Sequence, residues 1–206
     1  MEPDRLAIAA QFFAKNGFAV EVFADPEQVR EAFRRRLATV RSVGFGGSAT
    51  LRELGLDAVA RESPAQFIDH WAAAGDKPRD WEARLDQGRA ELFVTSANAA
   101  TIGGQLLLTD GAGNRLAASV FGPRQVLFVL GENKIMDGLD AAWLRIKRIA
   151  APQRARQLQM KTPCAEDGCC HDCQSPQRIC RATVIIERPS FGLTAGVWLV
   201  RGGWGL

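Results

Sequence analysis

The chain has 206 residues, of which 47% are hydrophobic and 24% charged, the proportions of a globular protein with a full apolar core. The net charge of +3 is small and the arginines are scattered, so composition gives no case for nucleic-acid binding. The acidic start and the lack of an apolar run of about 18 residues predict neither a secretory signal nor a membrane span. We therefore expect a cytoplasmic protein whose thiols are kept reduced.

Helices and strands are predicted in alternation along most of the chain. Apolar residues at helical spacing, with caps at the ends, predict helices over residues 3–15, 26–38, 48–55, 80–88 and 136–152. Apolar runs predict strands over residues 18–23, 39–47, 90–97, 105–111, 125–131, 181–188 and 195–205, the last two as a terminal pair. The most apolar strand, 125–131, is expected at the centre of the sheet. This order predicts an α/β fold with a mainly parallel sheet flanked by helices.

The chain shows no internal repeat, low-complexity tract or linker, so one domain over residues 1–206 is predicted. We expect it to contain an N-terminal helical part over residues 1–40, a ligand-binding α/β core over 41–160, and a Cys-rich segment with terminal strands over 161–206.

The segment VGFGGSATLRELGL, residues 43–56, joins a glycine turn to the start of a helix. Gly44, Gly46 and Gly47 let the backbone turn sharply and approach a ligand closely, and Ser48 is predicted to cap the helix. The free N–H groups of a first helical turn favour phosphate or carboxylate. Because the segment matches neither a Walker loop nor the full dinucleotide fingerprint, a purely structural turn is an equal alternative.

Three further loops follow predicted strands and carry amide or cationic side chains. They are TSANAAT (95–101), DGAGNRLAA (110–118) and GENKI (131–135). Ligands of open α/β sheets bind outside the carboxyl ends of the strands, where these loops are expected. A single Asn is more often a turn residue than a ligand contact. The set as a whole, with Arg115 and Lys134 in two of the loops, favours a small anionic ligand.

All five cysteines lie in the segment CAEDGCCHDCQSPQRIC, residues 164–180. A metal or iron–sulfur site, a set of disulfides and a redox switch are the competing explanations. Reduced thiols in the cytoplasm favour metal binding over disulfides, with unligated thiols as the remaining alternative.

Four segments follow one another in a fixed order, and they are VGFGGSATLRELGL, TSANAATIGGQLLLTDGAGNRLAASVFGPRQVLFVLGENKI, APQRARQL and the cysteine segment. Together they resemble the lactate-utilisation (LUD) domain family, LutC/YkgG-like, over about residues 40–206. The resemblance implies the Rossmann-like α/β fold of the ribose-5-phosphate isomerase/CoA-transferase-like superfamily, whose members bind CoA, sugar phosphates or folates near a comparable glycine-rich loop. It also implies a role in oxidising L-lactate to pyruvate beside iron–sulfur partner proteins.

The resemblance implies a ligand site but assigns no catalytic residue. With the loops above, the predicted ligand-binding residues are Gly44, Gly46, Gly47, Ser48, Asn98, Thr101, Asn114, Arg115, Asn133 and Lys134. The family pattern also selects four metal ligands in the spacing C-x5-C-x2-C-x6-C, which are Cys164, Cys170, Cys173 and Cys180. Four thiolates suit zinc or an iron–sulfur cluster, and the link to lactate oxidation favours the cluster.

Several polar residues are assigned no role in the chemistry. Cys169 is left outside the metal set, and His171 is expected to be exposed or to contact a metal ligand. His70 is expected to be a partly exposed residue of a helix or loop. Asp69, Asp110 and Asp137 are assigned to helix or turn capping.

Two functions follow from these predictions, and catalysis by the chain alone is undecided. The first is a subunit of a lactate-oxidising system, in which Arg115 and Lys134 neutralise a bound anion while Asn98 and Asn114 orient it. A metal centre in the cysteine segment and iron–sulfur partner proteins would carry electrons. The alternative is a stand-alone enzyme or binding protein for a phosphorylated or CoA-linked metabolite, with a structural zinc. Both readings are compatible with a homo-oligomer.

Overall fold

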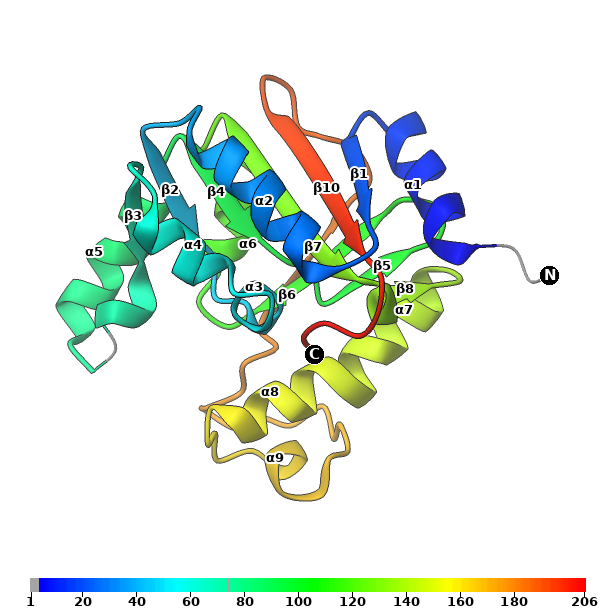
Figure 1. The fold of residues 1–206 in the computed structure, drawn as a ribbon. Coiled ribbons are helices and arrows are strands. Elements are labelled where there is room, and N and C mark those ends of the chain that lie inside the picture. The colour runs from blue at the N-terminus through cyan, green and yellow to red at the C-terminus, as the bar shows by residue number, and fades with distance from the viewer. Residues whose placement is uncertain (1–3, 74) are drawn as a thin grey trace.

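The computed structural model describes residues 4–73 and 75–206 of the chain. Within this range, six parallel strands form the main sheet in the order β1-β10-β7-β4-β2-β3 (Figure 1). These strands are β1 (Ala19–Phe23), β2 (Ser42–Phe45), β3 (Gln66–Asp69), β4 (Leu92–Thr95), β7 (Gln125–Gly131) and β10 (Thr194–Val200). The predicted α/β class with a parallel sheet is confirmed.

A second, smaller sheet has the order β8-β5-β6-β9. Its strands are β5 (Ala99–Thr101), β6 (Leu106–Asp110), β8 (Ile135–Met136) and β9 (Ala182–Ile186). Strand β6 runs antiparallel to β5 and β9, whereas β5 and β8 are parallel. The last two predicted strands therefore do not pair with each other, because β9 joins β6 while β10 lies between β1 and β7.

Helices and single helical turns connect the strands. They are α1 (Arg5–Lys15), α2 (Pro26–Leu37), α3 (Ala49–Glu53), α4 (Leu56–Glu62), η1 (His70–Ala73), α5 (Lys77–Gln87), α6 (Asn114–Val120), η2 (Glu132–Lys134), α7 (Leu139–Arg145), η3 (Ile146–Ala150), α8 (Ala151–Gln157) and α9 (Pro163–Asp167). No helix of the described chain is long and apolar enough for a membrane crossing.

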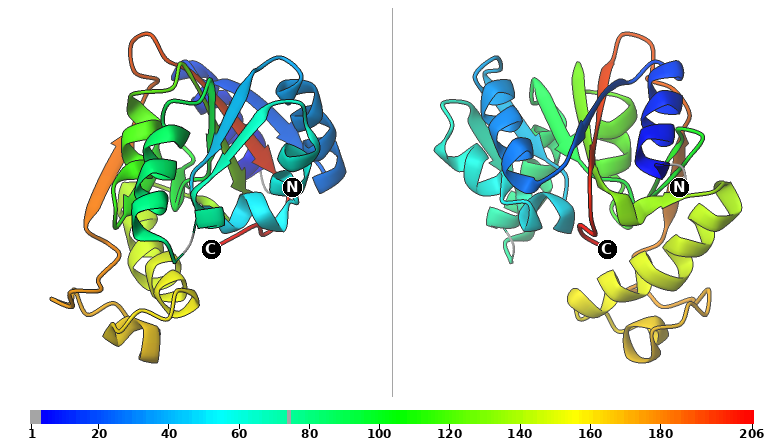
Figure 2. Two further views of the ribbon diagram at one scale, coloured as in Figure 1. Left: turned by 90° about the vertical axis from the view of Figure 1, so that its left-hand side faces the viewer. Right: turned by 45° about the vertical axis from the view of Figure 1, so that its right-hand side comes forward.

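The main sheet is the middle of three layers (Figure 2). Helices α2, α3 and α4 pack on one face, and α1, α6 and the small sheet pack on the other. Strand β7 contributes to both cores, since Leu127 and Val129 point to the first face while Val126, Phe128 and Leu130 point to the second. A central parallel strand needs apolar residues on both faces, which explains the continuous apolar run.

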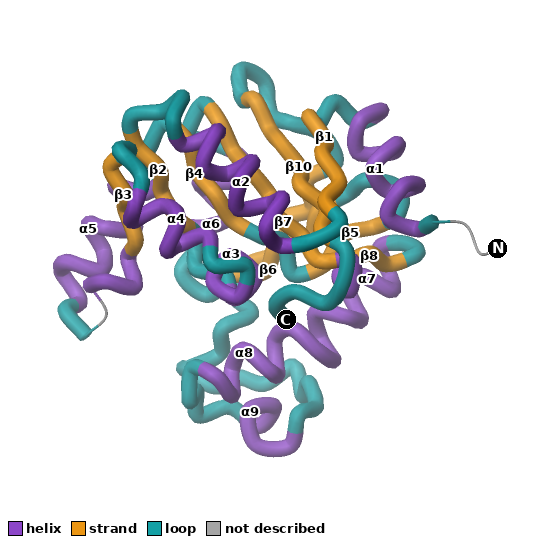
Figure 3. Tube along the Cα trace, in the orientation of Figure 1, coloured by secondary structure: helices purple, strands orange, loops and turns teal. Residues whose placement is uncertain are grey.

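The helix predicted over 136–152 continues beyond Pro152. Helix α7 passes through the π-helical turn η3 into α8, which ends at Gln157 (Figure 3). Proline lacks a backbone N–H and normally stops a helix. Here Pro152 is the second residue of α8, directly after the π turn, where the hydrogen-bond register changes and a missing N–H is tolerated.

The cysteine segment projects below the layers, beside α8, in both views of Figure 2. Helix α9 is held there by the Arg156 side chain, which donates to the carbonyl oxygens of Ala165 (2.8 Å) and Glu166 (3.0 Å). The first 40 residues, predicted as a helical part, also supply strand β1 to the main sheet.

Candidate functional site

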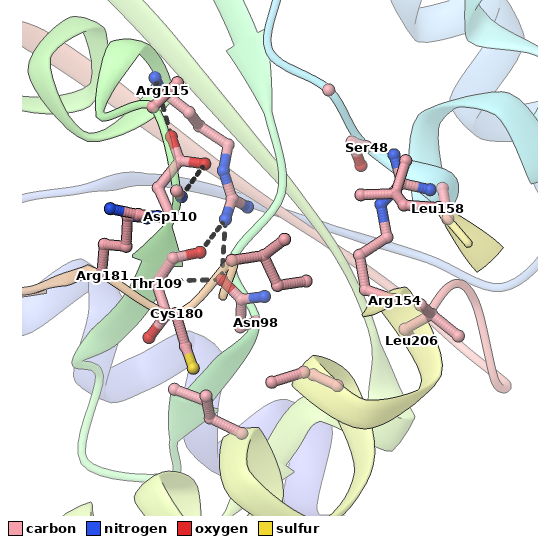
Figure 4. Close-up of a pocket in the computed structure, with 18 of the residues that line it drawn as sticks. Ser48, Asn98, Thr109, Asp110, Arg115, Arg154, Leu158, Cys180, Arg181 and Leu206 are labelled. Carbon is pink, nitrogen blue, oxygen red and sulfur yellow. Dashed lines mark hydrogen bonds between the residues drawn. The ribbon is translucent and has the colours of Figure 1, made fainter. Parts of the chain in front are cut away.

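A cavity of about 470 Å³ opens at the carboxyl edge of the main sheet. Its wall includes residues that directly follow β2, β3 and β4, together with the loop after β6 and helix α8. Figure 4 shows Asn98, Asp110 and Arg115 on one side of this pocket and Ser48 and Arg154 on the other. The carboxyl edge is where ligands of open α/β sheets bind, so the pocket lies where the loops predicted a site.

Arg115 is fixed in the wall by neutral oxygens. It lies at the start of α6 and is 9% exposed. Its Nη1 donates to the Ser96 carbonyl oxygen (3.0 Å), and its Nη2 donates to Asn98 Oδ1 (2.8 Å) and the Thr109 carbonyl oxygen (2.6 Å). Burial lowers the pKa of this guanidinium, and the nearby Asp110 carboxylate opposes part of the shift. The side chain is therefore a buried positive charge with oriented donors.

Lys134, in the 3-10 turn after β7, is the second buried cation of the wall. The side chain is 3% exposed. Its Nζ donates to Thr50 Oγ1 (2.8 Å), Ser96 Oγ (3.1 Å) and the Ala97 carbonyl oxygen (3.1 Å). Thr50 lies in the first turn of α3, whereas Ser96 and Ala97 lie in the loop after β4, so the lysine joins two neighbouring segments of the pocket wall.

The electrostatic environment of Lys134 disfavours its charged form. Burial lowers the pKa of the amine well below its usual value, and the positive charges of Arg145 and Arg115 lower it further. Glu53 has a smaller opposing influence. Arg145, behind the wall on α7, is itself buried, which lowers its pKa to about 10. An anion in the pocket would relieve this repulsion.

Arg154 projects from α8 on the far side of the pocket from Arg115 (Figure 4). Its guanidinium lies 5.1 Å from the centroid of the Trp71 ring, which Arg52 also approaches at 4.0 Å. Burial, Arg115 and Arg52 all lower the pKa of Arg154. The aromatic ring stabilises the cation without neutralising it.

The two predicted asparagines of the pocket differ in how their amides are used. Asn98 Oδ1 accepts from the Thr109 N–H (2.8 Å) and from Arg115. Its Nδ2 makes no hydrogen bond with any described residue and remains a free donor on the wall. Asn114 Oδ1 accepts from Arg84 Nη1 (3.0 Å).

Only part of the glycine segment reaches the pocket. Gly47 and Ser48 line it, and the Ser48 hydroxyl accepts from the Leu51 N–H (3.4 Å), which is the predicted helix cap. Gly44 and Gly46 are enclosed by protein instead. A Cβ on Gly44 would lie 2.7 Å from the Gln87 Cα, and one on Gly46 would lie 2.8 Å from Thr95 Oγ1. Close packing therefore explains why these two positions are glycine, in agreement with the alternative prediction of a purely structural turn.

Thr101 and Asn133 also lie outside the pocket lining. Thr101 Oγ1 accepts from the Gln105 N–H (3.1 Å) within the turn between β5 and β6. Asn133 binds the C-terminal segment, with its Oδ1 accepting from the Trp204 N–H (3.2 Å) and its Nδ2 donating to the Gly205 carbonyl oxygen (3.1 Å). The other six predicted residues line the pocket, and these are Gly47, Ser48, Asn98, Asn114, Arg115 and Lys134.

The expectation that His70 is a partly exposed residue is wrong. It begins η1 directly after β3, is 3% exposed and lines the pocket beside Gly47. Its Nδ1 lies 3.0 Å from Gln87 Oε1, so a neutral ring carries its proton on Nδ1 and leaves Nε2 unprotonated. Burial and Arg84 lower the pKa of His70, while Gln87 opposes the shift. The half-buried edge strand β3 has no strong apolar signal, which is why sequence reasoning missed this position.

The predicted capping aspartates have mixed contacts. Asp69 accepts from the Trp71 N–H (3.1 Å), and Asp110 accepts from the Gly111 N–H (3.0 Å), as capping residues do. Asp137 instead forms an ion pair with Arg5 (2.6 Å).

The five cysteines are free, and Cys169 is exposed while the others are half-buried. Across residues 4–73 and 75–206, no three Cys, His, Asp or Glu side chains come together in a group that could hold a metal ion. Cys180 lines the pocket, whereas Cys164 lies in α9. His171 is exposed and its Nε2 lies 2.6 Å from Asp167 Oδ2. In this arrangement the four predicted ligands do not fit a metal, and their ligation remains a prediction.

The parallel sheet with a cationic pocket at its carboxyl edge defines a Rossmann-like α/β protein. The model of the LUD domain family matches residues 6–194, and the chain belongs to that family. This membership associates the protein with lactate utilisation.

A crystal structure of a DUF162 family protein from Deinococcus radiodurans has a similar fold, with a TM-score of 0.56 and 16% sequence identity. The match covers 97% of this chain and 99% of that chain. No curated protein matches the chain.

Proposed function

We propose that this LUD-domain protein serves lactate utilisation by binding a small anionic metabolite in the pocket at the carboxyl edge of the sheet. The observation that carries the proposal is a set of wall cations without a carboxylate partner. None of the ion pairs among the described residues includes Arg115, Lys134 or Arg154. Buried charges are normally paired, so a bound anion is the partner that these cations lack.

The contacts of these side chains suggest different parts in binding. Lys134 and Arg115 are tied to protein oxygens, and they would act on the anion through their charge. The Nδ2 of Asn98 is free, so it can donate directly and orient the ligand. His70 Nε2 would face the same ligand beside Gly47 as a neutral acceptor.

Replacing Lys134 by Met tests the proposal. Titration calorimetry with L-lactate, pyruvate and inorganic phosphate would be run on both proteins at low ionic strength. We expect the variant to bind the favoured anion about tenfold more weakly, because a charge in a poorly screened site is lost. Lys15→Met, at the exposed end of α1, is the matched control. Unchanged affinity in the Lys134 variant would contradict the proposal.

The second part of the proposal concerns electrons. In a lactate-oxidising system the cysteine segment would hold an iron–sulfur cluster or zinc through Cys164, Cys170, Cys173 and Cys180, and iron–sulfur partner proteins would accept electrons. Metal analysis and a visible spectrum of protein purified without oxygen test this part. Iron with sulfide supports an electron carrier, one zinc supports a structural clip, and no metal contradicts ligation.

A further inference from the structure

The pocket wall carries more positive charge than its own carboxylates neutralise. Two of its arginines are paired, since Arg84 contacts Asp80 (2.7 Å) and Arg178 contacts Asp172 (2.7 Å). Four more cations on the wall have no carboxylate within ion-pair distance in the part of the chain that the structure describes, and these are Arg115, Lys134, Arg154 and Arg181.

Asp110 is the one acidic side chain on the described wall. Its Oδ1 accepts from the Gly111 N–H (3.0 Å) and its Oδ2 accepts from the Arg115 N–H (3.2 Å). These backbone contacts hold the carboxylate in its turn. Four unpaired cations therefore share the described wall with one acidic side chain, and a ligand with a single negative charge would leave an excess of positive charge in the pocket.

The free donors of the wall lie on facing sides. Arg154 makes one hydrogen bond with the described chain, from Nη1 to Gln157 Oε1 (3.1 Å), so its Nε and Nη2 remain available. Asn98 Nδ2 is available on the other side (Figure 4). A phosphate group presents three acceptor oxygens in different directions, whereas a carboxylate presents two in one plane. Donors on opposite walls suit the phosphate group.

The pocket also has room and apolar surface for an organic body. A volume of about 470 Å³ falls in the range, roughly 300–1,000 Å³, of pockets that enclose drug-sized ligands. The pocket lining also includes the apolar residues Ile146, Leu158 and Trp71. A three-carbon acid would fill little of this space.

We infer that the ligand is a phosphorylated organic metabolite, bound through its dianionic phosphate group, rather than a monocarboxylate such as lactate itself. The inference rests on the proposed anion site and specifies its ligand class. Arg154 and Asn98 donate to the phosphate oxygens, while Lys134, Arg115 and Arg181 supply the balancing charge.

Calorimetric titrations at pH 7.5, in a phosphate-free buffer of low ionic strength, test the inference. The probes are inorganic phosphate, pyrophosphate, L-lactate, pyruvate and malonate, the last as a dicarboxylate of matched charge. We expect phosphate and pyrophosphate to bind at least about tenfold more tightly than lactate, pyruvate or malonate. Arg154→Met should remove most of that preference. Arg148→Met is the matched control, because Arg148 is exposed on the preceding turn of the same helical segment.

The outcomes separate this inference from the proposed function. Lactate or pyruvate binding as tightly as phosphate would overturn the phosphate assignment and leave the anion site standing. Malonate binding as tightly as phosphate would likewise overturn it, since charge alone would then decide affinity. Phosphate affinity that survives Arg154→Met would place its site elsewhere. Failure of all five probes to bind would overturn both proposals.

Discussion

The pocket at the carboxyl edge of the main sheet and the cysteine segment, residues 164–180, both contain several reactive side chains, but the fold fixes them to different degrees. Arg115 and Lys134 are buried in the pocket, and each makes three side-chain hydrogen bonds to protein oxygens. The thiols are half-buried or exposed, and the described chain brings no three potential metal ligands together. A site fixed by buried hydrogen bonds is organised before its ligand arrives, whereas a surface loop takes its geometry from what binds it.

The largest effect expected from a single change is at Gly44 of strand β2, which leads to the pocket residues Gly47 and Ser48. A Cβ there would meet the main chain of Gln87, which cannot move aside as a side chain can. We expect Gly44→Ala to lower the free energy of unfolding by about 3 kcal/mol, and to displace the Gln87 contact with His70. Urea unfolding measures the loss.

The matched change in the cysteine segment is Gly168→Ala. Gly168 has a φ of +81°, and a Cβ there would make only an ordinary contact, 3.7 Å from Arg156 Nη2. The cost should be about 1 kcal/mol, from the left-handed backbone alone. Equal losses for the two variants would show that the pocket is no more tightly packed than the segment.

Thiol labelling compares the accessibility of a pocket cysteine with that of an exposed one. Cys180 lines the pocket and packs against buried apolar residues, whereas Cys169 is exposed. We expect iodoacetamide to modify Cys169 about tenfold faster than Cys180, as read by peptide mass spectrometry, because access controls the rate. Pyrophosphate should slow Cys180 further and leave Cys169 unchanged. If pyrophosphate protected both thiols, or neither, the result would contradict binding of pyrophosphate in the pocket beside Cys180.

The smallest effect expected is a dependence of stability on pH. The pKa of His70 is lowered from 6.5 in the folded chain, so the unfolded chain takes up a proton first as the pH falls. Stability should therefore decrease as the pH is lowered through about 6.5 towards the folded pKa. His70→Gln should flatten this part of the profile in urea unfolding from pH 5 to 8.

The chain offers its own control for this experiment. His171 is the second of two histidines and lies exposed in the cysteine segment. His171→Gln should keep the pH dependence of the natural chain. A flattened profile in that variant, or an unchanged one in His70→Gln, would assign the dependence to another group.

Local patterns were enough to predict most elements of the fold. Strand β7 was predictable because an unbroken apolar run must be buried on both faces, and α2 because Pro26 marks its first turn. The partners of β9 and β10 were not, since pairing between distant segments leaves no local trace. The passage of the helix through Pro152 depends on a π turn that has no sequence signature.

The candidate site was predictable only where its residues sit in loops after strong strands. Asn98, Arg115 and Lys134 follow such strands and line the pocket. His70 follows a weak edge strand, and Arg154 lies on a helix that the chain brings back to the sheet from a distant segment. Neither position can be linked to the pocket without the tertiary packing.

The place of β10 has a consequence for the order in which the protein is made. Strand β1 pairs with β10 and with no other strand of the described chain. Residues 19–23 leave the ribosome well before their partner, residues 194–200, because most of the fold lies between them in the sequence. Strand β1 therefore has no strand partner until the residues up to β10 have been synthesised, which makes its pairing in the main sheet a non-local folding step.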